Sequence, residues 1–146
     1  GNVAGQRWLG ICYLEGIGIG QNRNEAIKWL NKAAEQGLGD AYYYLAVECI
    51  LTRFLDDEFH HRENPLSEKE EKLIDEKTGE YYLKAAKLNN GIMKVECQST
   101  VANAYRYGDY GFNKDIVRAR YWYEIAFKNG NEYSGRCIEE IDKWGE

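Results

Sequence analysis

LGICYLEGIGIG at residues 9–20, followed by NRNEAIKWLNKAAEQG at residues 22–37, decides the fold of this chain. Three alternating glycines follow the first apolar stretch, and a glycine inside a helix costs about 1 kcal/mol relative to alanine. The pattern therefore predicts a helix over residues 2–14, a glycine turn, and a second helix that ends at Gly37. Asn22 with Glu25 three residues later is typical of a capping box.

The same pattern returns as VANAYRYGDYG at residues 101–111 and ARYWYEIA at residues 119–126. Leu45 corresponds to Leu9 at a spacing of 36 residues, but the glycine turn is missing after it. A period of this length is typical of stacked helix pairs that bury a common core.

The middle repeat is longer than the others. Leu45 and Val101 are 56 residues apart, which indicates an insertion of 20 residues. Asp40 is a candidate N-cap for a helix that starts at about Ala41, and Ser67 with Glu70 predicts a capping box before a long helix to Leu88.

We expect an all-α fold, an α-α superhelix (solenoid) of about three helix-turn-helix repeats plus a C-terminal capping helix. The prediction is one domain over residues 1–146, with repeats at 2–37, 38–91 and 92–130, an insertion at about 53–72, and a cap at 131–146. In the cap helix, the residues expected to face the preceding repeat are Cys137, Ile138, Ile141 and Trp144.

Two repeats carry a shared set of glycine, alanine and aromatic positions. In the first repeat these are Leu9-Gly10, Tyr13, Gly16-Ile17-Gly18, Ala26, Trp29, Lys32-Ala33-Ala34 and Gly37. In the third they are Val101, Ala102, Tyr105, Gly108, Gly111, Ala119, Trp122-Tyr123, Ala126 and Gly130. The set resembles the pattern of the Sel-one-like repeat (SLR) family, relatives of tetratricopeptide repeats, over nearly the whole chain apart from the insertion.

The resemblance implies a superhelical scaffold whose first helices line a concave face, in proteins similar to adaptors that assemble complexes. It also implies a bacterial source and favours the bacterial envelope or periplasm, although the residues themselves do not decide the compartment. A cysteine-rich bacterial subgroup of the family binds or hydrolyses β-lactams, which implies a hydrolase of β-lactams or cell-wall substrates as an alternative.

Charge and composition exclude some classes of partner. The net charge is −5, and residues 56–77 hold nine acidic against four basic residues, so the acidity is local. Nucleic-acid binding needs a basic footprint, which is missing, and no apolar run is long enough for membrane insertion. No targeting leader is evident at Gly1. The acidic insertion is either a solvent-exposed segment that the solenoid tolerates or an element that recognises a basic partner.

No catalytic, metal or cofactor site emerges from the sequence. Cys12, Cys49, Cys97 and Cys137 form no CxxC pair, so we expect buried free thiols, with Cys97 and Cys137 as the first pair to test for a disulfide. The only histidines, His60 and His61, lie with Glu63 in a charged loop, which favours a solvated loop over a metal site. A helix precedes the glycines at 16–20, which disfavours a nucleotide loop. We expect a protein that is not an enzyme.

The helical period places one set of residues on the concave face, between the packing positions of the first helices. These candidate partner-binding residues are Arg7, Ile11, Leu14, Tyr43, Val47, Ile50, Ser99, Asn103, Arg106 and Arg136. Tyr and Arg are enriched in binding hot spots. We expect a scaffold or adaptor that binds a protein or peptide here and is a monomer apart from its partner. An immunity-type inhibitor that neutralises a toxin enzyme is an alternative.

Overall fold

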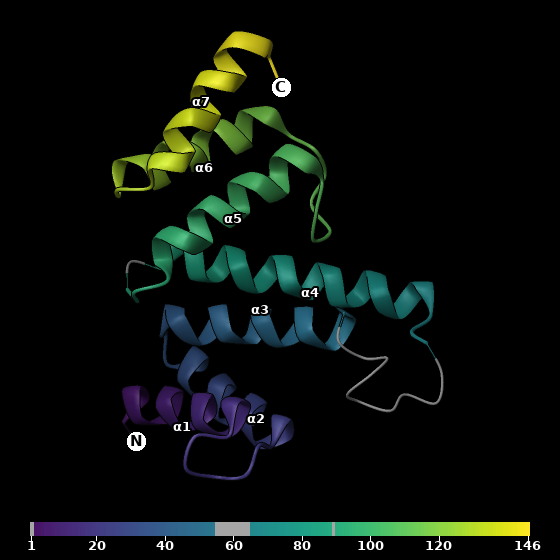
Figure 1. Cartoon of the computed structure of the whole chain (residues 1–146), viewed down its shortest axis with the longest axis vertical. Helices are drawn as coiled ribbons and strands as arrows, with labels where there is room; N and C mark the ends of the chain where they lie inside the picture. The colour runs from purple at the N-terminus through teal and green to yellow at the C-terminus, as the bar shows by residue number, and fades with distance from the viewer. Residues whose placement is uncertain (1, 55–64, 89) are drawn as a thin grey trace.

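The computed structural model describes residues 2–54, 65–88 and 90–146. Within these ranges the chain forms seven α-helices and no strand, stacked from the N-terminus at one end to the C-terminus at the other (Figure 1). The predicted all-α stack of helix pairs with a terminal capping helix is confirmed. The acidic residues 56–58 and the candidate metal ligands His60, His61 and Glu63 lie outside the described residues.

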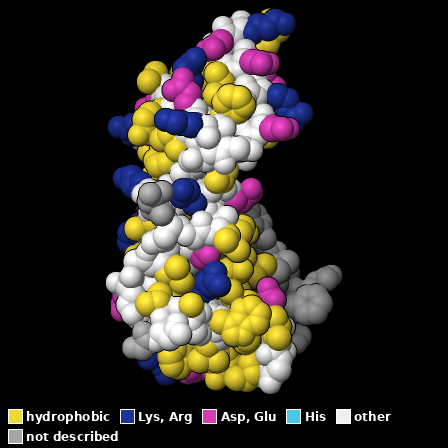
Figure 2. All heavy atoms as spheres, turned by 90° about the vertical axis from the view of Figure 1, so that its left-hand side faces the viewer, with side chains coloured by type: hydrophobic (Ala, Val, Ile, Leu, Met, Phe, Trp, Pro, Cys, Tyr) yellow, Lys and Arg dark blue, Asp and Glu magenta, His cyan; other side chains and the backbone are white. Residues whose placement is uncertain are grey.

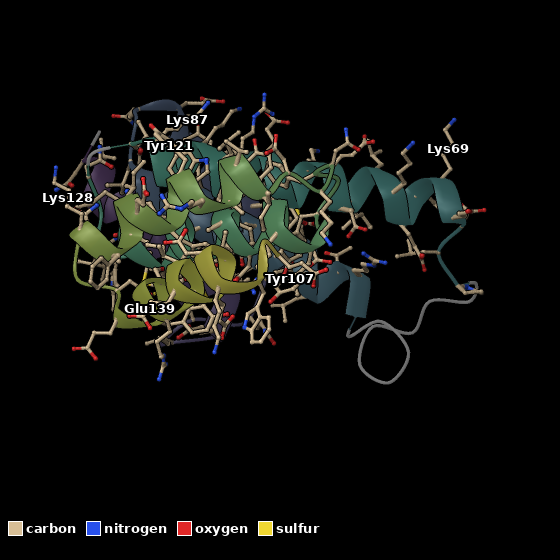
Figure 3. All side chains as sticks on the ribbon, turned by 90° about the horizontal axis from the view of Figure 1, so that it is seen from above. Lys69, Lys87, Tyr107, Tyr121, Lys128 and Glu139 are labelled. Atoms are coloured by element: carbon tan, nitrogen blue, oxygen red, sulfur yellow. The ribbon has the colours of Figure 1, made fainter. Side chains whose placement is uncertain are left out.

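Each helix packs on the next one along the chain. The helices are α1 Val3–Glu15, α2 Arg23–Glu35, α3 Gly39–Phe54, α4 Glu68–Lys87, α5 Lys94–Tyr107, α6 Ile116–Lys128 and α7 Glu132–Trp144. In addition, α1 contacts α3 and α3 contacts α5, so the first helices of successive pairs adjoin. The N-terminal end of α4, marked by Lys69, extends beyond the other described helices (Figure 3).

Short polar side chains cap the N-termini of α1, α2, α4, α6 and α7. The Asn22 side chain accepts the amide of Glu25 at 3.1 Å, which is one of the two bonds of the predicted capping box. The predicted capping box at α4 is complete, because the Ser67 hydroxyl accepts the Glu70 amide and the Glu70 carboxylate accepts the Ser67 amide at 2.8 Å. Gly16, with φ +73°, ends α1 in the left-handed region that favours glycine.

Small residues let the helix pairs approach closely. A Cβ at Gly10 would lie 2.7 Å from Cγ of Leu30, so only glycine permits this contact between α1 and α2. At the equivalent position of the second repeat, Ala46 is fully buried. In the third repeat the core contains the buried Tyr123 and Val101, packed beside Cys97 and Cys137. Trp144 is exposed rather than packed on this core, so the predicted inward orientation of that residue is wrong.

Asp40 joins all three repeats. It is 2% exposed and lies in the first turn of α3, not at its N-cap as predicted. Its carboxylate accepts the amide of Met93 at 2.9 Å and that of Ile92 at 3.2 Å, just before α5. The same carboxylate pairs with Arg7 of α1 at 2.8 Å. One buried charge is therefore satisfied by groups from the first and third repeats.

Glycine and asparagine complete this junction. The Asn90 side chain accepts the Gly39 amide at 2.7 Å and donates to the Gly37 carbonyl at 2.8 Å. Gly91 has φ +92°, and a Cβ there would lie 2.4 Å from Oδ1 of Asp40. Gly91 is therefore required both by its backbone angle and by the space that Asp40 occupies.

No helix in the described ranges is long and apolar enough to span a membrane.

We expect Gly91→Ala to lower the free energy of unfolding by about 1–3 kcal/mol more than Gly37→Ala, measured by urea denaturation. Both glycines have positive φ, +92° and +84°, so the two variants share the backbone strain. Only Gly91 faces an obstacle, because the space beside Gly37 is open. Equal destabilisation of the two variants would contradict the role of the Asp40 junction.

Candidate functional site

The first helices of the pairs form one continuous surface, which we call the first-helix face and define as the outward sides of α1, α3, α5 and α7. Contacts join α1 to α3 and α3 to α5. Side chains continue the row to α7, because Arg106 of α5 pairs with Glu140 at 3.0 Å. A chain bound along this face would therefore meet all the repeats without a break.

The ten predicted binding residues divide by accessibility. Ile11, Leu14 and Ser99 are buried, so their predicted exposure on the face is wrong. They pack inward because the buried stripe of each first helix covers more of the helix surface than the repeat pattern predicted. The residues that retain accessible surface are Arg7, Tyr43, Val47, Ile50, Asn103, Arg106 and Arg136.

Within the first two repeats this surface is aromatic and held in place. The Tyr43 ring meets Tyr44 edge-on at 5.2 Å between centroids and Tyr82 at 6.3 Å. Burial raises the pKa of the Tyr43 and Tyr44 hydroxyls, so both are neutral at physiological pH. Arg7, beside them, is engaged by Asp40. This half offers rings and hydroxyl groups rather than free charge.

Four side chains form a polar and aromatic group between α5 and α7, which we call the α5–α7 cluster: Asn103, Arg106, Tyr107 and Tyr133. The Arg106 side chain is 11% exposed, donates to Glu140 and to the backbone carbonyl of Glu146, and lies 5.4 Å from the Tyr107 ring centroid. The Tyr133 hydroxyl is 3.4 Å from Oδ1 of Asn103. The cluster is thus ordered by its own hydrogen bonds.

The surroundings of Arg106 and of Tyr133 fix the protonation states of these two side chains. Burial alone would lower the pKa of Arg106, but hydrogen bonds with Glu140 and with Tyr123 outweigh it and raise that pKa. A hydrogen bond with Cys137, together with burial, raises the pKa of Tyr133 to about 12. The cluster therefore contains a permanent cation, which is paired with Glu140, and a neutral phenol.

Tyr107 and Tyr133 are the binding candidates that the sequence pattern did not indicate. They are 59% and 42% exposed, and large aromatic side chains at such exposure are typical of interaction surfaces. Figure 3 shows Tyr107 and Glu139 on the side of the stack opposite to Lys87 and Tyr121. The adjacent Arg106-Tyr107 pair in the sequence was the available signal, because both residue types favour binding.

Apolar side chains are not spread evenly over the molecule. Figure 2 shows the left-hand side of Figure 1, where hydrophobic side chains gather over the N-terminal half with a few charged groups among them. The outline narrows between the two halves in the same view.

Two of the four thiols, those of Cys97 and Cys49, are unsuited to nucleophilic chemistry. All four cysteines are free thiols, and Cys12, Cys97 and Cys137 are buried as expected, whereas Cys49 is only partly buried. Cys97 and Cys137, the first pair to test for a disulfide, are not joined. Burial raises the pKa of Cys97 to about 12 and also raises that of Cys49. A thiol that stays protonated is a poor nucleophile and a poor metal ligand. No group of three or more His, Cys, Asp or Glu side chains could hold a metal ion in the part of the chain that the structure describes.

The geometry defines a class: an α-solenoid built from helix-turn-helix repeats of the tetratricopeptide kind. The Sel1 repeat pattern matches residues 3–38, 75–90 and 95–131. The chain belongs to the Sel1 repeat family. Sel1 repeats are generally non-catalytic scaffolds for protein–protein interaction.

Solved structures agree with this assignment. The chain is similar to a Sel1 repeat protein from Oxalobacter formigenes, with 29% identity and a TM-score of 0.71, over 95% of this chain and 89% of that one. It is also similar to a protective antigen of uropathogenic Escherichia coli strains that displays an SLR fold, with 25% identity and a TM-score of 0.72. That match covers 98% of this chain and 26% of the antigen. No curated protein sequence matches the chain.

We expect Cys97 to resist Ellman's reagent at pH 8 in the folded protein, because the thiol is fully buried and protonated. A variant that keeps Cys97 as its only cysteine isolates this thiol. Adding Glu139→Cys to a cysteine-free chain gives the control, since residue 139 is exposed. The control should react at least about 100-fold faster, whereas equal rates would contradict the buried thiol.

Proposed function

We propose that this chain is an adaptor that binds an extended segment of a protein partner along the first-helix face, with the α5–α7 cluster as the anchor. One observation carries the proposal: two exposed tyrosines flank an arginine that hydrogen bonds already hold in place. Tyrosine and arginine dominate binding hot spots, and ordering them before binding lowers the entropy lost on association.

The continuity of the face supports an extended ligand rather than a small one. Tyr43, Val47 and Ile50 of α3 add partly exposed apolar and aromatic area next to the cluster's own helix α5. Asn103 and the two tyrosine hydroxyls add hydrogen-bonding groups that suit a peptide backbone. The partner is therefore proposed to contribute backbone amides and apolar side chains, with an acidic group next to the exposed Arg136.

Neutralisation of a toxin enzyme would use the same surface, so the two interaction hypotheses differ in the partner and not in the site. A β-lactam or cell-wall hydrolase gains no support from the thiols, because Cys97 and Cys49 have raised pKa values. The adaptor proposal needs no catalytic group.

We expect Tyr107→Ala to weaken partner binding by at least about tenfold, because truncating a hot-spot tyrosine typically costs 2 kcal/mol or more. The partner is first captured from a lysate of the source organism with the tagged wild-type chain. Binding of the purified partner to each variant is then measured by calorimetry.

Tyr121→Ala is the matched control for this experiment. Tyr121 is the same residue type at 58% exposure, but it lies on the opposite side of the stack (Figure 3). Its variant should bind the partner as tightly as the wild type does. If Tyr107→Ala leaves the affinity unchanged, or if Tyr121→Ala weakens it equally, the α5–α7 cluster is not the anchor. A partner with toxin activity that the chain inhibits would favour the neutraliser over the adaptor.

A further inference from the structure

Two hollows lie next to each other along α4. The first, of about 250 Å³, lies between α4 and the turn that joins α5 to α6, and its lining includes Glu76, Glu80, Leu83, Tyr110 and Phe112. The second, of about 520 Å³, lies between α4, α5 and α6, and is lined by Leu83, Lys87, Tyr105, Arg118, Tyr121 and Trp122. Lys87 and Tyr121 lie together on the side of the stack opposite to Tyr107 (Figure 3).

The two hollows form one continuous depression, which we call the α4 groove. On one wall, Leu83 of α4 lines both hollows. On the facing wall, the ring of Phe112 from the first hollow meets the ring of Tyr105 from the second edge-on, with 4.6 Å between centroids. A ligand in one hollow can therefore continue into the other over apolar surface.

The turn that forms part of this wall is held firmly on α4. Tyr110 has φ +52°, an uncommon conformation for a residue other than glycine. A Cβ at Gly79 of α4 would collide with the Tyr110 carbonyl oxygen and lie 2.7 Å from Cε2 of Phe112, so only glycine permits this contact. The groove is therefore formed before any ligand binds, which lowers the entropy lost on association.

The groove carries opposite charges at its two ends. Among the described residues, the first hollow is lined by the carboxylates Glu76 and Glu80 and by no cation. The second is lined by the cations Lys87 and Arg118 and by no carboxylate. Glu76 and Lys87 are exposed, and neither has an ion pair with a residue that the structure describes. This charge separation selects a ligand with a cation at one end and an anion at the other.

The remaining charges of the groove are only weakly engaged. Glu80 pairs with Lys84 at 2.7 Å, and Arg118 pairs with Asp115 at 3.5 Å, each one helix turn away on exposed surface. Exposed pairs of this kind contribute little to stability, so a ligand can replace them. Burial raises the pKa of the Tyr110 hydroxyl, so this ring adds no charge at physiological pH.

The distance between the charged ends sets the length of the ligand. Glu76 and Lys87 lie eleven positions apart, which places them on the same face of α4. At a rise of 1.5 Å per helical residue, their backbones are about 16 Å apart. An extended peptide of about five residues covers this distance. A single amino acid or a small organic ion is too short to reach both ends.

We propose that the α4 groove binds an extended segment of a protein in which a basic and an acidic residue lie about four positions apart, with an apolar side chain between them. The basic side chain lies beside Glu76 and Glu80, over the ring of Phe112, where cation–π attraction adds to the charge attraction. The acidic side chain lies beside Lys87 and Arg118. The groove is separate from the first-helix face, so the chain can hold two partners at once.

Titration of the full chain with the pentapeptide Lys-Ala-Phe-Ala-Glu, acetylated and amidated at its ends, tests this proposal by nuclear magnetic resonance. The first, third and fifth side chains of an extended peptide share one face, so all three can enter the groove. We expect saturable shifts of the amide signals of Leu83, Lys87 and Phe112. An absence of saturable shifts at these residues would overturn the site.

A charge exchange tests whether the groove selects the ligand by its charges. We expect Lys87→Glu to weaken binding of this pentapeptide by at least about fivefold, because an attraction becomes a repulsion, and to bind Lys-Ala-Phe-Ala-Lys more tightly instead. Lys128→Glu makes the same change at an exposed position outside the groove and should keep the preference of the wild type. If Lys87→Glu also keeps that preference, the proposal is overturned.

Two tyrosine variants separate this site from the proposed first-helix face. Tyr121→Ala removes part of the groove wall and should weaken the pentapeptide, whereas Tyr107→Ala lies on the opposite side of the stack and should leave its affinity unchanged (Figure 3). The reverse result would place the pentapeptide at the α5–α7 cluster and overturn the α4 groove. Since the assay uses a synthetic peptide, its outcome is independent of whether a captured partner depends on Tyr107.

Discussion

The Asp40 carboxylate is the interaction on which the arrangement of the repeats depends. It is buried, and a buried charge must be neutralised and hydrogen-bonded where it lies. Here the groups that satisfy it are the Arg7 guanidinium of α1 and two amides that precede α5. The position of α3 between its neighbours is therefore fixed by directional bonds as well as by apolar packing, and the row of first helices follows from that placement.

The second repeat keeps the helix pair of the family but departs from the family's sequence pattern. The Sel1 pattern matches nothing between residues 39 and 74, and α3 and α4 are the longest helices of the described chain. Glu48 and Thr52 of α3 lie beside Arg23 of α2 and accept hydrogen bonds from it. A segment that the repeat pattern does not match thus retains the helix packing.

The sequence predicted where the helices begin and end better than it predicted which side chains lie on their surface. Glycines such as Gly16 mark helix ends through local backbone angles, and a local pattern suffices to read them. The role of Asp40 depends on amides more than fifty positions away, which no local pattern contains. Ile11 and Leu14 were placed on the surface because the repeat period gives the direction of a side chain but not the width of the buried stripe. Tyr133 reaches the cluster from α7, which packs on α6 and meets α5 through side chains.

In solenoids where each repeat contacts only its neighbours, an end can unravel while the rest stays folded. The Asp40 junction alters that expectation here, since it takes partners from the first and the third repeat at once. Loss of either terminal repeat would leave the buried Asp40 carboxylate without part of its ion-pair and hydrogen-bond partners. The junction thus raises the cooperativity of the whole array, so that a short solenoid responds to denaturant or to pulling on its ends as a single unit.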